Sequence, residues 1–66
     1  MPTCYMKDVH TIGFDGYRFL IRPAAGPGMH LIGKARTVSG QVYALFRGIK
    51  WVYGRPYNTA CAVKVR

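Results

Sequence analysis

Apolar and polar residues alternate with period two along most of the chain, a pattern typical of half-buried β-strands. The alternation is clearest on both sides of Asp15-Gly16, a dipeptide that favours a type I′ turn because both central residues need a positive φ. Folding the chain at this turn predicts three pairs on one face: Phe14 with Tyr17, Ile12 with Phe19, and His10 with Ile21. A shift of one residue would exchange the two faces, so the pattern also predicts the register of this hairpin.

A loop and a further strand are predicted outside this hairpin. Residues 23–28 contain two prolines and two glycines, which remove backbone donors and allow a positive φ, so we expect a loop there. The alternation returns after residue 60, where Cys61, Val63 and Val65 share one face and Lys64 and Arg66 share the other. This stretch is therefore predicted to be a strand.

Residues 40–53 fit both a helix and a pair of strands. Apolar residues recur there at three- and four-residue spacing, with Ser39 placed as an N-cap and Gly54 as a C-terminal glycine. In the strand interpretation, Ser39-Gly40 and Arg47-Gly48 are two-residue turns. The segment is rich in β-branched and aromatic residues, which favour strands, and Gly48 would weaken a helix by about 1 kcal/mol. We therefore predict strands.

The strand interpretation assigns both faces of this segment and leads to a fold class. The residues predicted to face the core are Val42, Ala44, Phe46, Ile49, Trp51 and Tyr53, and those predicted to face away include Lys34, Arg36, Tyr43 and Lys50. The predicted fold is mainly β, a single domain over residues 1–66 in which an antiparallel meander of five or six strands curls into an SH3-like or OB-like barrel. The alternative is an α+β arrangement, ββ(β)αβ, with a helix over about residues 40–53.

The balance of charge indicates the kind of partner. Ten Lys and Arg residues stand against two acidic residues, and the formal net charge is +8. Ordinary protein surfaces mix both signs, so this excess favours a polyanion, and we expect DNA or RNA as the partner. No helix-turn-helix, zinc-finger or RNP signature is present, so contacts to the backbone are expected to dominate. The candidate binding residues are Arg18, Arg22, Lys34, Arg36, Tyr43, Lys50, Lys64 and Arg66, with Tyr43 as a stacking residue.

The sequence offers little for catalysis or for metal binding. Asp8 and Asp15 are the only carboxylate side chains and do not form the pair that general acid–base roles need, so the protein is predicted not to be an enzyme. Structural zinc sites use closely spaced ligand pairs, a spacing that is absent among Cys4, His10, His30 and Cys61. We expect no metal and no other cofactor, and we expect free thiols in place of a disulfide.

A second class of function uses the same charge. A small modulator of phage or plasmid type would bind and inhibit an acidic host protein through its basic face, and nine aromatic residues suit a protein interface. The first residues lack the apolar core of a signal peptide, and the longest apolar run, residues 42–46, is too short for a membrane span. We therefore expect a cytoplasmic protein with no membrane contact, and a homodimer is one way to cover its sheet edges.

Overall fold

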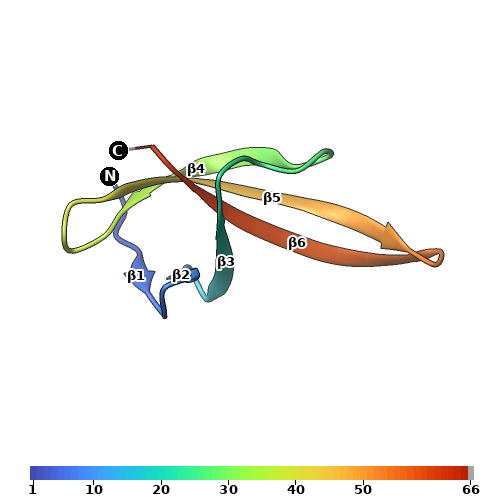
Figure 1. Cartoon of the computed structure of the whole chain (residues 1–66), viewed down its shortest axis with the longest axis horizontal. Helices are drawn as coiled ribbons and strands as arrows, with labels where there is room; N and C mark the ends of the chain where they lie inside the picture. Colours follow the sequence, from blue (N-terminus) through green and yellow to red (C-terminus); the bar gives the residue numbers. More distant parts are fainter. Residues whose placement is uncertain (66) are drawn as a thin grey trace.

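The protein folds as one sheet of six β-strands. The computed structural model describes residues 1–65. The strands are β1 (Tyr5–Met6), β2 (Thr11–Phe14), β3 (Tyr17–Arg22), β4 (His30–Arg36), β5 (Val42–Val52) and β6 (Arg55–Lys64). Their order across the sheet is β1-β2-β3-β6-β5-β4 (Figure 1). None of residues 1–65 is helical, so the mainly β prediction is confirmed and the helix over residues 40–53 is wrong.

The β2–β3 hairpin forms as its sequence predicts. Asp15 and Gly16 have φ values of 52° and 79°, which are the positive values that a type I′ turn requires. Ile12 pairs with Phe19 and Phe14 pairs with Tyr17, in the predicted register. Beyond the ladder, the Ile21 N–H donates a hydrogen bond to the His10 carbonyl over 2.7 Å. Local turn chemistry and alternation therefore agree in this part of the chain.

The topology departs from a meander at one position, because β3 and β6 run parallel. After β3 the chain crosses through residues 23–29 to β4 at the far edge of the sheet, and two hairpins then return it so that β6 lies beside β3 (Figure 1). The two edges of the sheet, β4 and the segment just before β1, meet at one corner. There the Cys4 N–H donates to the Arg36 carbonyl over 3.0 Å, and the Arg36 N–H donates to the Pro2 carbonyl over 2.9 Å. The sheet is thus a curled half-barrel of SH3-like or OB-like size.

One of the two turns predicted in the central segment is present and the other is wrong. The β4–β5 turn lies at Ser39-Gly40 as expected, although its loop is one residue longer, since the Thr37 N–H donates to the Gln41 carbonyl over 2.8 Å. No turn occurs at Arg47-Gly48, because β5 continues from Val42 to Val52. The chain turns instead at Tyr53 and Gly54, whose φ values are 50° and 76°.

Gly48 has a different role, in the middle of β5. Its φ is not among the positive values of the chain. A Cβ at this position would lie 2.8 Å from the carbonyl oxygen of Gly28 and 3.1 Å from the Cα of Met29. Real Cβ atoms do not approach a backbone oxygen this closely. The glycine therefore allows the loop between β3 and β4 to pack directly on β5.

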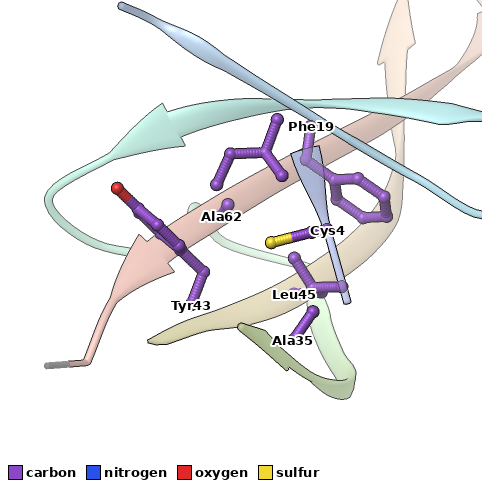
Figure 2. Close-up of a cluster of buried hydrophobic side chains, with 7 residues drawn as sticks. Cys4, Phe19, Ala35, Tyr43, Leu45 and Ala62 are labelled. Atoms are coloured by element: carbon purple, nitrogen blue, oxygen red, sulfur yellow. The ribbon is translucent and has the colours of Figure 1, made fainter. Parts of the chain in front are cut away.

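The core lies on one face of the sheet, which we call the inner face. Figure 2 shows its cluster of buried side chains, which comprises Cys4, Ile12, Phe19, Ala35, Tyr43, Leu45 and Ala62. In β5 and β6, Leu45 pairs directly with Ala62, and both are fully buried. The predicted faces are therefore reversed over residues 42–46 of β5, whereas Ile49 and Trp51 lie on the inner side and Lys50 on the outer side, as predicted. The predicted alternation in β6 is right, but it places Cys61 and Val63 on the outer face.

Candidate nucleic-acid interface

Strand pairing determines which of the predicted cations share a face. Residues that pair directly across a sheet point to the same side of it. One such row crosses four strands and consists of Arg22 in β3, Val63 in β6, Ala44 in β5 and Lys34 in β4. Ala44 neighbours the core residue Leu45, so this row lies on the outer face. Three strand spacings separate Arg22 from Lys34, a distance of about 14 Å.

Five predicted residues lie on this outer face. Arg18 alternates with Arg22 along β3, Arg36 follows Lys34 along β4, and Lys50 has the same alternation as Ala44 in β5. All five side chains are exposed. We call this set the outer cationic face: Arg18, Arg22, Lys34, Arg36 and Lys50.

Two of the other three predicted site residues do not join this face. Tyr43 is 4% exposed and belongs to the core, so the prediction of Tyr43 as a stacking residue is wrong. Its hydroxyl donates to Oε1 of Gln41 over 3.2 Å, which satisfies the polar atom while the ring packs. Lys64 is exposed but pairs with Tyr43, which places it on the inner side. Arg66 lies outside the described residues.

Two cations on the outer face are absent from the sequence-based set. Lys7 lies against Gly13, where an added Cβ would clash with its side chain, and Gly13 pairs with Arg18. Arg55 pairs with Val52, and it is exposed on the same side as Lys50. Neither is found by alternation alone, since Lys7 precedes the hairpin and Arg55 follows a turn that was predicted elsewhere.

The two acidic side chains lie outside the strands that carry these cations, although Asp15 lines one pocket together with Lys7 and Arg18. Asp8 precedes β2 and Asp15 forms the β2–β3 turn, and no acidic residue follows Asp15 in the sequence. The His10 N–H donates to Oδ1 of Asp8 over 2.7 Å, and this bond holds the pKa of the Asp8 carboxyl below its ordinary value. The cations of β3 to β6 therefore have no carboxylate side chain on their own strands to neutralise them.

A groove of about 670 Å³ opens between the β3–β4 loop and the β5–β6 hairpin. Arg22 and Lys50 of the outer cationic face both line it, together with apolar side chains that include Leu20 and Met29. The Cys61 Sγ lies 3.7 Å from the Met29 Sδ in this lining. The groove therefore combines an apolar surface with two cations, which suits a flat aromatic group that carries negative charge close to it.

The ends of β5 and β6 next to their connecting turn form a two-stranded arm, residues 48–59. Pairing of β4 with β5 extends no further than His30 with Arg47, and pairing of β3 with β6 begins at Cys61. Among the described residues, the strands of the arm therefore pair only with each other, and Figure 1 shows them reaching beyond the rest of the sheet. The molecule is accordingly elongated, with principal extents of 40 × 18 × 18 Å.

Aromatic side chains on the arm are exposed. Trp51 is 67% exposed, so its predicted place in the core is wrong, because no described strand covers the arm. Tyr53 at the turn is fully exposed, and Tyr57 is half-exposed opposite Lys50. By contrast, the Arg47 guanidinium at the base of the arm lies 4.2 Å from the centroid of the Tyr17 ring, in a cation–π contact. The arm thus presents Tyr57 beside Lys50 on its outer side and Trp51 on its inner side.

The two cysteines are free, buried and on different faces of the sheet. Cys4 lies in the inner core, whereas Cys61 pairs with Phe46 on the outer side. Burial raises the pKa of the Cys4 thiol above its ordinary value. Within residues 1–65, no three His, Cys, Asp or Glu side chains come together as a metal site would require.

No helix among the described residues is long and apolar enough to cross a membrane. Comparisons with protein families, with curated proteins and with solved structures found no match to this chain.

Proposed function

We propose that the protein binds nucleic acid, and that the outer cationic face makes the phosphate contacts. One observation carries the proposal. Arg18, Arg22, Lys34, Arg36 and Lys50 share one face of the sheet, and the strands that hold them contain no acidic side chain. A backbone of regularly spaced phosphates complements such a face, and its binding releases condensed counterions. Lys7 and Arg55 extend the same face at its two ends.

The expected recognition is of backbone and shape, with no catalytic step. Cations about 14 Å apart across the strands match phosphates that are separated by several nucleotides of a single chain, or that belong to different strands. The groove between Arg22 and Lys50 offers a place for one base beside these phosphates. A cytoplasmic location suits the two free thiols, since a reducing compartment keeps them reduced.

The dependence of affinity on salt tests this proposal. Five neutralised phosphates predict that log K falls against log salt concentration with a slope of about −4.5 on duplex DNA and about −3.5 on a single strand. The assay is fluorescence anisotropy of labelled 20-nucleotide DNA and RNA, in duplex and single-stranded form, across a salt series. Arg22→Ala and Lys34→Ala should each make the slope shallower by about one unit.

Lys64→Ala provides the matched control, because Lys64 is an exposed cation on the inner side. This variant removes the same charge from the molecule, so an equal loss in all three variants would mean that only net charge matters. The proposal fails if no nucleic acid binds at about 0.15 M salt. Capture of one defined acidic protein that survives nuclease treatment would then favour the modulator alternative.

A further inference from the structure

The arm carries apolar ring surface that the fold does not use. A two-stranded ribbon by itself is only marginally stable in water. Side chains that are exposed on such a ribbon add little to the stability of the fold. Trp51 and Tyr53 are nevertheless large, and both are exposed near the tip. Trp51 pairs with Pro56 across the ribbon, and no other described strand pairs with either residue. Both side chains are therefore accessible to a partner.

Tyr53 is also an unfavourable choice for its own turn. Its φ of 50° lies in the left-handed region, which Gly, Asn and Asp adopt readily and bulky residues rarely adopt. Asp15 occupies the equivalent position of the β2–β3 turn, where the residue type suits the conformation. The fully exposed Tyr53 side chain offers no packing in return for this strain. Strain that the fold does not offset is typical of positions kept for function.

The charge of the arm selects the kind of partner. Lys50 and Arg55 lie on the arm, and it contains no acidic residue. A second copy of the chain would bring its own +8 charge against these cations, so self-association through the arm is disfavoured. Lys50 and Arg55 lie on one side of the ribbon and Trp51 on the other. A flexible polyanion with flat aromatic groups matches both sides, because its phosphates can contact the cations while its bases stack on the rings.

We propose that the β5–β6 arm binds single-stranded nucleic acid, with unpaired bases stacking on Trp51 and Tyr53. This inference rests on the proposed function and adds a second element to it. The outer cationic face contacts the backbone of any strand, whereas the arm needs bases whose faces are free. Duplex bases are stacked on each other, so the arm confers a preference for single strands.

Trp51 is the only tryptophan in the chain, and its fluorescence therefore reports on this position alone. Stacking on a base is expected to quench its emission as a 12-nucleotide oligothymidine is added, while the duplex of that sequence with oligoadenosine leaves the emission almost unchanged. Binding itself is followed separately, by anisotropy of a labelled oligonucleotide. Tyr53→Asn removes the second ring and keeps a residue that suits the turn, so the arm is expected to remain folded.

Tyr53→Asn and Trp51→Leu should each weaken oligothymidine binding about five-fold or more, with little change in duplex binding. Val38→Asn is the control, because Val38 is an exposed apolar residue in the β4–β5 turn, outside the arm. This variant should bind both forms as the original chain does. Circular dichroism and thermal unfolding of each variant show whether the sheet is intact.

The outcomes separate this inference from the proposed function. If the labelled strand binds but Trp51 is not quenched and Tyr53→Asn has no effect, the arm inference is overturned and the cationic face stands. Equal losses on duplex and single strand would overturn the role of unpaired bases. A dimer seen by sedimentation without nucleic acid, and abolished by Trp51→Leu, would make a second copy the occupant of the arm. Absence of any binding would refute both proposals.

Discussion

Gly48→Ala is expected to destabilise the protein, although adding a methyl group to a strand glycine is normally neutral or favourable. The new Cβ would lie 2.8 Å from the Gly28 carbonyl oxygen, 3.1 Å from the Met29 Cα and 3.2 Å from the Met29 Cγ. The first two are backbone atoms, so the β3–β4 loop must move. Overpacking of this kind costs about 1–3 kcal/mol. The central value of this cost, about 2 kcal/mol, exceeds the stability of about 0.4–1 kcal/mol that is gained by restricting the unfolded chain.

The central values leave a net cost of about 1.3 kcal/mol. For a domain of this size, 1 kcal/mol shifts the melting temperature by about 4–8 °C, so we expect a decrease of roughly 5–10 °C. Thermal unfolding followed by circular dichroism measures it. Displacement of the loop also separates Met29 from Cys61, whose sulfur atoms are 3.7 Å apart. Cys61 should therefore react faster with a thiol reagent, as read by mass spectrometry of the labelled peptide.

Gly33→Ala is the matched control, since Gly33 also lies in a strand and lacks a positive φ, and its added Cβ would meet nothing within 4 Å. Its melting temperature should be unchanged or slightly higher. The packing argument would be refuted if Gly48→Ala were as stable as the original chain. It would also be refuted if both variants lost stability equally, because the cost would then belong to strand glycines in general.

Two further predictions concern the core. Leu45→Ala should lower the free energy of unfolding by about 2–5 kcal/mol, because Leu45 is fully buried; Ile32→Ala, at an exposed position of β4, should cost far less in the same urea titration. Burial raises the pKa of the Cys4 thiol, so the unfolded chain loses this proton first as the pH rises. Stability that is fully present at neutral pH should therefore decline above about pH 9, and Cys4→Ala should show a shallower decline in urea titrations at pH 7, 9 and 10. An unchanged pH dependence in Cys4→Ala would contradict this assignment.

The parts of the fold that could be predicted are those with local causes. Asp15-Gly16 specifies its own turn, and only one register of the flanking residues buries Ile12 and Phe19 together. The same alternation places Arg18 with Arg22, and Lys34 with Arg36, on shared faces of β3 and β4. Most of the candidate cationic face follows from these two short strands.

The central hairpin could not be predicted in the same way, because β5 is apolar at both alternating sets of positions. Val42, Ala44 and Phe46 compete with Tyr43 and Leu45 for the core, and hydrophobicity does not distinguish them. The position of the turn could not be predicted either, because the turn occurs at Tyr53-Gly54, where a bulky residue adopts a positive φ that bulky residues rarely adopt. Contact of Gly48 with Gly28 and Met29, twenty residues away in the chain, assigns Gly48 to the strand.

The first hairpin, the preference for strands and the excess of positive charge were predictable, because each depends on neighbouring residues or on composition alone. Burial of Tyr43 and exposure of Trp51 depend instead on contacts between distant parts of the chain. Both outcomes follow from the parallel pairing of β3 with β6. That pairing joins the first part of the β5–β6 hairpin to the rest of the sheet and leaves the remainder as an arm. It brings together segments that are about forty residues apart, a separation that no local pattern encodes.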